Sequence, residues 1–391
     1  MKRIYLDNAA TTPTRLEVIE AMQPFFKHSF GNPSSVHFFG KETSNALNEA
    51  RSRIAQLLGS KDDEIIFVSG GTESDNLAIF GTAYANRDKG RHIITTAIEH
   101  NAVLEPCRYL EREGWKITYL PVTGDGLVDP DDVKRAITGE TILISVMHAN
   151  NEIGTIQPLR EIGLIARENE ICFHTDAVQT FSHIPTKADD LNIDLLSFSS
   201  HKFYGPKGTG GLYVRKGTAI SPYIFGGNQE FKLRAGTENV PAIVGMGKAV
   251  QMSMLEMDAQ KSYVASLRDK LVRSLLEIEG VRLNGHESQR LPNNINISVD
   301  FVESETMIIN LDFKGIAVSS GSACISAMKG PSHVLTAIGL SYEEARSSIR
   351  ITLGKDNTEE ELSYFLDVFN DVVNNLRDMS PVFQERRLGS R

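Results

Sequence analysis

The chain has 391 residues, of which 41% are hydrophobic and 23% charged, and its formal net charge is -9. This length is enough for a large core and two domains. An acidic chain without a basic stripe argues against nucleic acid as a direct ligand. No apolar stretch approaches the ~20 residues that cross a membrane, and none precedes the first acid, Asp7. We therefore expect no membrane contact and a cytoplasmic location.

The first elements are a strand, a packing helix and a second strand that leads into a helix. Residues 4–15 indicate a short strand and a polar turn, and apolar residues at helical spacing predict a helix over 43–58. The strand E-I-I-F-V-S then meets G-G-T-E-S, a glycine pair that opens a helix. Free N–H groups at a helix start favour phosphate, and Thr72 adds a hydroxyl. A glycine pair is also a common tight turn.

Strands and helices then alternate, which predicts a mainly parallel sheet with helices on both faces. Successive strands end near His100, near Asn151, and at Asp176 and Gln179. In such a sheet these ends share one edge, where open α/β folds bind ligands. Taken singly, each of these residues is more often a cap, a turn residue or a structural histidine. Together they supply a carboxylate for a ring nitrogen and an imidazole, as an aldehyde cofactor bearing phosphate requires.

The next strand, residues 193–198, ends in a tight turn with the sequence S-S-H-K, and a neighbouring strand is expected over 211–214. An amine at a strand end, beside hydroxyls and an imidazole, is suited to form a Schiff base. Lys202 is therefore the candidate anchor of an aldehyde cofactor. The alternative is a solvated loop lysine, which describes most lysines.

The second half predicts a smaller α/β unit. Helices are expected over 241–257 and again through the apolar positions 267–278, and we place the domain boundary near residue 258. The expected division is a large domain over 15–258, and a small domain formed by 1–14 and 259–391. The segments I-N-I-S-V, M-I-I-N-L, I-A-V-S-S and S-I-R-I-T-L are interpreted as short strands and apolar turns. Arg350, in the last of these, can bind a substrate carboxylate or form a domain-interface ion pair.

Three cysteines cannot make a disulfide framework and lack metal-ligand spacing, so no metal site is expected. Cys107 in a helical stretch and Cys172 in a strand are interpreted as small buried hydrophobic residues. Cys324 differs, because residues 319–332 are rich in serine, glycine and alanine and predict a flexible loop. A thiol on such a loop is accessible, as a nucleophile must be, although chance exposure of a free cysteine stays open.

The motifs taken together resemble a known family. In chain order they are Y-L-D-N-A-A-T-T, G-G-T-E-S-D-N, E-H-N-A-V, N-N-E-I-G, H-T-D-A-V-Q, S-S-H-K-F-Y-G-P-K-G, R-A-G-T-E-N and S-S-G-S-A-C. The chain resembles the cysteine desulfurases of the NifS/IscS type from about Tyr5 to Leu353. The resemblance implies the fold-type-I, class V aminotransferase architecture, with a mainly parallel seven-stranded sheet, pyridoxal 5'-phosphate as cofactor and a homodimer. It also implies conversion of L-cysteine to L-alanine, with the sulfur left as a persulfide.

The same resemblance assigns roles to individual residues. Lys202 would be the Schiff-base lysine, Asp176 the partner of the pyridinium nitrogen, and His100 the ring that stacks on the cofactor and assists proton transfer. Gln179 would contact the phenolic oxygen, and Cys324 would accept the sulfur. The cofactor phosphate would be bound by Gly71, Thr72, Ser199 and His201, and by Thr237 from the other subunit. The substrate carboxylate would be bound by Arg350 and Asn151. Asn151 would also contact the cofactor.

Several alternatives stay open. The nearest is another enzyme of the same fold, a selenocysteine lyase or a different class V enzyme. A binding or scaffold protein that has lost catalysis is the alternative from another class. The spacing from Cys324 to Pro331 resembles long-loop members that hand sulfur to an iron–sulfur scaffold or a tRNA-thiolation enzyme, and thiamine-pathway acceptors are open too. Transient ligation of a cluster by Cys324, and docking of an acceptor on the tail over 380–391, are further hypotheses.

Overall fold

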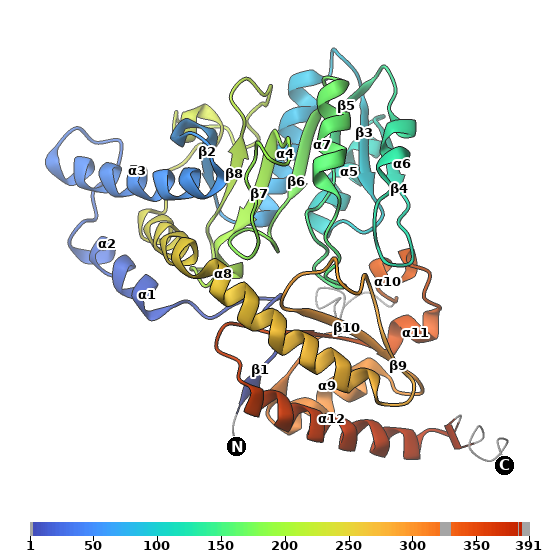
Figure 1. The fold of residues 1–391 in the computed structure, drawn as a ribbon. Coiled ribbons are helices and arrows are strands. Elements are labelled where there is room, and N and C mark those ends of the chain that lie inside the picture. The colour runs from blue at the N-terminus through green and yellow to red at the C-terminus, as the bar shows by residue number, and fades with distance from the viewer. Residues whose placement is uncertain (1–2, 321–329, 382, 385–391) are drawn as a thin grey trace.

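A seven-stranded sheet forms the centre of the larger of two lobes (Figure 1). The computed structural model describes residues 3–320, 330–381 and 383–384. The strand order is β2-β8-β7-β6-β5-β3-β4, and every neighbouring pair is parallel except the two that include β8. The strands are β2 (Ile65–Val68), β3 (His92–Thr96), β4 (Lys116–Leu120), β5 (Thr141–Ser145), β6 (Cys172–Asp176), β7 (Leu195–Ser199) and β8 (Gly210–Val214). The prediction of a mainly parallel seven-stranded sheet is confirmed.

Helices cover both faces of this sheet because its strands are apolar on both sides. In β7, Leu196 and Phe198 face a core shared with α3, α7 and α8, whereas Leu195 faces the opposite side and packs with α4. Helix α5 joins α4 on that second side. The larger-lobe helices are α1 (Leu16–Met22), α2 (Pro24–Lys27), α3 (Phe38–Leu58), α4 (Gly71–Asn86), α5 (Asn101–Arg112), α6 (Pro130–Ala136) and α7 (Leu159–Glu168), with short 3-10 turns η1 (Asp62–Glu64), η2 (Ser200–Lys202) and η3 (Glu230–Lys232).

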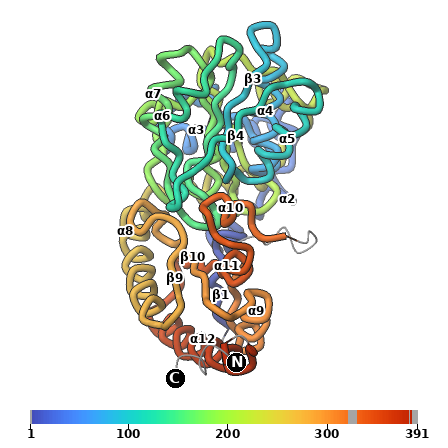
Figure 2. The backbone as a smooth tube through the Cα atoms, turned by 90° about the vertical axis from the view of Figure 1, so that its right-hand side faces the viewer, coloured from blue at the N-terminus to red at the C-terminus, as the bar shows by residue number. Residues whose placement is uncertain are grey.

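The smaller lobe lies below the first in Figure 2, and it contains both the first strand, β1, and the last helix, α12. It holds an antiparallel three-stranded sheet, β12-β10-β9, and a parallel pair, β1 with β11. Its strands and helices are β1 (Ile4–Tyr5), β9 (Val281–Leu283), β10 (Asn294–Val299), α9 (Ser304–Phe313), β11 (Ile316–Ala317), α10 (His333–Ala337), α11 (Tyr342–Arg346), β12 (Ser348–Thr352) and α12 (Glu359–Met379).

Helix α8 (Val240–Leu276) connects the two lobes as one continuous element of 37 residues. The sequence predicted two helices here, with a boundary near residue 258. No glycine or proline lies between 248 and 276, so nothing in the backbone ends the helix there. Its first half packs in the larger lobe through Met246 and Val250, and its second half packs in the smaller lobe through Leu267 and Leu271. The division at 258, which falls within α8, stays a proposal.

Two further predictions differ from the observed elements. Segment 307–311, expected to be a strand or turn, lies in α9, where Met307 and Leu311 are both buried one helical turn apart. A five-residue apolar run does not by itself distinguish the two periods. Helix α3 begins at Phe38 rather than near residue 43, because the His37 side chain accepts a hydrogen bond from Gly40 N and caps the first turn. Over the described ranges, no helix combines the length and apolarity needed to cross a membrane.

Candidate active site

A cavity of about 310 Å³ lies at the carboxyl edge of the large sheet, where the smaller lobe meets it. Its volume falls at the lower end of the ~300–1,000 Å³ range of small-molecule sites. Ten residues named from the sequence line it: Gly71, Thr72, His100, Asn151, Asp176, Gln179, Ser199, His201, Lys202 and Arg350. The expectation that polar strand ends meet at one edge is therefore confirmed.

Two predicted site residues are not in this cavity. Thr237 is exposed and lines a separate hollow with Phe30 and Pro33, on the side of the larger lobe formed by the segment after α2. Cys324 lies outside the described residues. The other two thiols are those expected to be structural. Cys107 is fully buried, and Cys172 is only partly covered; burial raises the pKa of both thiols, which keeps them protonated and unreactive.

Lys202 ends the η2 turn that follows β7, and its amine points to the N-terminal segment of the chain. Nζ donates to the carbonyl oxygens of Ala9 at 2.5 Å and Ala10 at 3.0 Å. Gln179 Nε2 donates to the same Ala9 oxygen at 3.0 Å. His183 Nε2 donates to the Lys202 carbonyl at 2.8 Å and fixes the backbone of the turn. The amine is therefore a half-buried group in a polar cavity, unlike a solvated loop lysine.

Asp176 is the last residue of β6 and is 6% exposed. Its Oδ1 accepts a hydrogen bond from Val178 N at 2.8 Å. Burial raises the pKa of this carboxyl, while His100, the Val178 hydrogen bond and the charge of Lys202 oppose the rise. A cationic ring nitrogen placed beside it would favour the ionised form further.

His100 is the N-cap of α5, and its Nδ1 accepts a hydrogen bond from Ala102 N at 3.1 Å. In the neutral ring the proton is therefore on Nε2. Burial lowers the pKa of His100 most; Asp176 opposes this effect, and the charge of Lys202 adds to it, as His333 does when it is protonated. The imidazole is accordingly neutral near pH 7.

The phosphate candidates surround the start of the sixteen-residue helix α4. Gly71 is required there, because an added Cβ would come within 2.7 Å of Val178 Cγ2. The first turn offers N–H groups that lack intrahelical acceptors. His201 Nδ1 is 3.1 Å from Thr11 Oγ1, and burial, helped by two nearby lysines, lowers the pKa of this ring to about 4. His201 is therefore a neutral hydrogen-bonding group.

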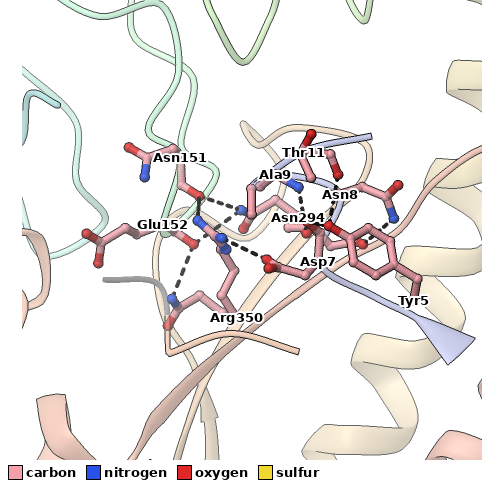
Figure 3. A network of polar contacts seen from close by, with 12 residues as sticks. Tyr5, Asp7, Asn8, Ala9, Thr11, Asn151, Glu152, Asn294 and Arg350 are labelled. Carbon is pink, nitrogen blue, oxygen red and sulfur yellow. Dashed lines mark hydrogen bonds and ion pairs between the residues drawn. The ribbon is translucent and has the colours of Figure 1, made fainter. Parts of the chain in front are cut away.

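Arg350 lies in β12, lines the cavity from the smaller lobe and is 2% exposed. Figure 3 shows it within a network of polar contacts with Asp7 and Asn151. Its Nη2 is 2.9 Å from Asp7 Oδ1, and Nη1 donates to the Asn151 carbonyl at 3.0 Å. Its backbone N donates to the Ser319 carbonyl at 2.6 Å and its carbonyl accepts from Ser319 N at 3.1 Å. Arg350 thus forms an ion pair, as one sequence interpretation expected, and it also lines the cavity. Its binding of a substrate carboxylate stays a prediction.

Sequence reasoning named no role for three further acidic or basic groups around the cavity. Glu152 lines it and accepts a hydrogen bond from Ser332 Oγ at 2.5 Å. Glu99, fully buried, accepts from Met147 N at 2.9 Å, and His333 Nε2 donates to the Glu99 carbonyl at 2.9 Å. Burial raises the pKa of both carboxyls, that of Glu99 to about 8. The two glutamates stand inside motifs quoted above, whereas His333 gives no local signal.

The arrangement fits pyridoxal phosphate, judged by its donor set. A helix N-terminus with a glycine that admits no side chain suits the phosphate, and a buried carboxylate at a strand end suits a ring nitrogen. An imidazole and an amine, each half-buried or more, line the space between them. These are the groups that such a cofactor needs from a protein.

Comparison with known proteins gives the class. The profile of the family described as "Aminotransferase class-V" matches residues 4–365. The chain belongs to this family, whose members are pyridoxal-phosphate-dependent enzymes.

Similar proteins narrow the class. The chain is 57% identical to "Cysteine desulfurase IscS" of Dictyoglomus turgidum, over the whole of both chains. It is 54% identical to the protein of the same name from Methanosarcina thermophila, over 97% of this chain and 94% of the other. A solved structure called "NIFS-LIKE PROTEIN" has a TM-score of 0.90 at 39% identity, covering 95% of this chain and all of that one. "SspA in complex with cysteine" has a TM-score of 0.81 at 39% identity, covering 91% and 100%.

Proposed function

We propose that this protein is a cysteine desulfurase, which uses pyridoxal phosphate to convert L-cysteine to L-alanine and keeps the sulfur as a persulfide. The convergence of the Lys202 amine and the Arg350 guanidinium on one cavity carries the proposal, because an amino acid presents an amine and a carboxylate together. The names of relatives that match the full length support it.

The proposed cofactor site follows the geometry. Lys202 would react with the cofactor aldehyde, and Asp176 would bind the ring nitrogen, with His100 over the ring. The N-terminal turn of α4 at Gly71 and Thr72, with Ser199 and His201, would hold the phosphate. Gln179 would contact the phenolic oxygen from the side where its amide already meets Ala9.

The chain's own residues then have separable tasks. Arg350 and Asn151 would bind the substrate carboxylate and turn the Cα–H bond toward Lys202. Once its amine is displaced by the substrate amine, Lys202 would take the Cα proton; the bound cofactor supplies an electron sink for the charge left on that carbon. His100, neutral near pH 7, can donate or accept a proton at Nε2. The Cys324 thiolate would attack the substrate sulfur, so that a sulfur–sulfur bond forms while the Cβ–sulfur bond breaks and leaves its electron pair on carbon. A proton added at Cβ, and the return of a proton from Lys202 to Cα, would complete L-alanine.

The test compares alanine formed from L-cysteine, with a reducing thiol present, by wild type and by Cys324→Ala. We expect wild type to form alanine, and the variant to form it at a rate lower by a factor of roughly a hundred or more, because the sulfur acceptor is lost. Bound-cofactor absorbance should be the same in both proteins. Equal alanine from both would remove Cys324 from the mechanism and favour a selenocysteine lyase. No alanine from a wild type that binds the cofactor would overturn the proposal.

The finer assignments belong to the same proposal. We infer delivery of sulfur to an acceptor protein, an iron–sulfur scaffold or a tRNA-thiolation enzyme, and a cytoplasmic location, because a reducing compartment maintains the free thiol that the reaction requires. We also infer a homodimer in which Thr237 reaches the partner's phosphate site. The exposure of Thr237 and its distance from this chain's own cavity support that role.

A further inference from the structure

His333 begins helix α10, which packs against the larger lobe at the rim of the cavity. The next two residues, Val334 and Leu335, are buried with Ile98 and Met147, which follow strands β3 and β5. The helix is therefore attached to the strand ends that carry the site. His333 itself is half-buried and lines the cavity.

Hydrogen bonds of Ser332 and of the His333 ring fix the orientation of His333. Ser332 Oγ donates to the buried Glu152 carboxyl at 2.5 Å and accepts from Val334 N and Leu335 N, so it is both an anchor and the N-cap of α10. The His333 ring donates from Nε2 to the Glu99 carbonyl at 2.9 Å. Because a carbonyl oxygen can only accept, the neutral ring has its proton on Nε2 and a lone pair on Nδ1. Among the residues that the structure describes, Nδ1 has no hydrogen-bond partner.

Most other polar groups of the cavity have a task in the proposed function; Asp75 and Asn101 are the exceptions among the residues that line it. One set would hold the cofactor, and Arg350 and Asn151 would bind the substrate carboxylate. The Glu152 carboxyl already accepts a hydrogen bond from Ser332 within the protein. His333 is the remaining ring among the cavity-lining residues, and it lines the same cavity as His100.

We propose that His333 binds the side-chain thiol of the substrate, with Nδ1 accepting a hydrogen bond from the S–H group. This inference rests on the proposed function, since it needs an amino acid that bears a thiol. A thiol is a weak hydrogen-bond donor, and the lone pair on a neutral imidazole nitrogen is an acceptor. Because Nδ1 of His333 has no partner among the described residues, it is available to a substrate thiol. The contact orients the sulfur and distinguishes L-cysteine from L-alanine, whose amine and carboxylate are the same.

The test uses the holoenzyme with Cys324→Ala as background, so that L-cysteine binds without sulfur transfer. The dissociation constants of L-cysteine and L-alanine are measured from the change in cofactor absorbance. With His333→Leu we expect L-cysteine to bind roughly three- to tenfold more weakly, as for the loss of one hydrogen bond. L-alanine should change by less than about twofold, because it never made the contact.

Two isosteric variants separate the thiol contact from the anchor. His333→Gln can place an N–H near the position of Nε2 but no acceptor near Nδ1, so it should lose the preference for L-cysteine and keep the melting temperature. His333→Asn can place its Oδ1 near Nδ1, so it should retain more of the preference than Gln while losing the bond to Glu99. Thr336→Ala, an exposed change on the same helix, is the matched control and should alter neither ligand.

The outcomes are distinguishable from a failure of the proposed function. Equal weakening of both ligands in the Leu and Gln variants would overturn the thiol contact and make His333 a purely structural residue. Unchanged binding of both ligands would overturn it as well. If wild type with Cys324 intact forms no alanine, the desulfurase proposal fails, whereas the ratio of the two dissociation constants still reports on the contact with His333.

Discussion

At the scale of residues, the site consists of polar groups whose charges are set by burial. His100 and His201 are neutral because their pKa values are lowered, and Glu99 is protonated near pH 7 because its pKa is raised to about 8. Among these groups, the cations of Lys202 and Arg350 are the positive charges presented to a substrate carboxylate. The charge of Asp176 raises the pKa of Glu99 further. Because Glu99 is neutral, it does not repel Asp176.

The protonation of Glu99 has a consequence for stability. An acid whose pKa is higher in the folded state stabilises fully below its unfolded pKa, and this contribution is lost as pH rises through the folded value of about 8. We expect the free energy of unfolding of the apo-protein to fall with pH more steeply in wild type than in Glu99→Gln, by up to about 1.4 kcal/mol per pH unit between pH 5 and 8.

Urea unfolding at several pH values measures this difference. The Gln side chain keeps the acceptor that Thr96 Oγ1 and Met147 N use, so the variant should remain folded. Glu113→Gln, an exposed change, serves as control and should leave the pH dependence as in wild type. Identical slopes in wild type and Glu99→Gln would contradict the assignment of a buried neutral acid.

At the scale of elements, helix α8 packs closely against helix α3. Gly247 faces Ala50 of α3, and an added Cβ would lie 2.6 Å from the Ala50 Cβ. The two helices are therefore in contact at a point where only glycine fits. The same helix continues into the smaller lobe, so the packing of α3 against α8 also sets how α8 approaches that lobe.

Gly247→Ala tests the close approach. In an exposed helix interior this change stabilises by about 1 kcal/mol, but here we expect a loss of about 1–3 kcal/mol because the contact is overpacked. Lys261→Ala, an exposed position on the same helix, should change stability by less than about 0.5 kcal/mol. The free energies come from denaturant unfolding. A stabilised Gly247→Ala protein would show that α3 and α8 separate without cost.

At the scale of the whole molecule, the cavity requires both lobes and the N-terminal segment. Tyr5 pairs with β11 in the smaller lobe, Asp7 binds Arg350, and the Ala9 carbonyl accepts from Lys202 of the larger lobe. A segment of a few residues thus connects the two walls of the site. Three exposed aromatic side chains lie elsewhere: Phe30 before α3, Phe38 at the first residue of α3 and Phe225 after β8, at 65%, 70% and 83% exposure.

These aromatic residues support the proposed homodimer, because Phe30 lines the same hollow as Thr237. Large exposed apolar side chains close to Thr237 are typical of a protein–protein interface. We expect Phe30→Asp with Phe38→Asp to shift the protein from dimer to monomer in sedimentation and to weaken cofactor binding. Phe313→Asp, equally exposed on α9 of the smaller lobe, is the control and should leave the dimer intact. A dimer that survives the double change would place the interface elsewhere.

The sequence by itself determined the fold class, the alternation of strands and helices in the larger lobe, and ten of the residues that line the cavity, because strand periodicity, polar strand ends and the motifs that carry the family resemblance are local signals. Only the tertiary structure decided that α8 runs unbroken past residue 258 and that segment 307–311 is helical, since short apolar runs and helix continuity depend on what packs against them. It also decided the contacts of Lys202 with Ala9, of Arg350 with Asp7 and of His333 with Glu99. These pairs are separated by more than 190 residues, and burial, which sets the charge of each group, exists only in the folded chain.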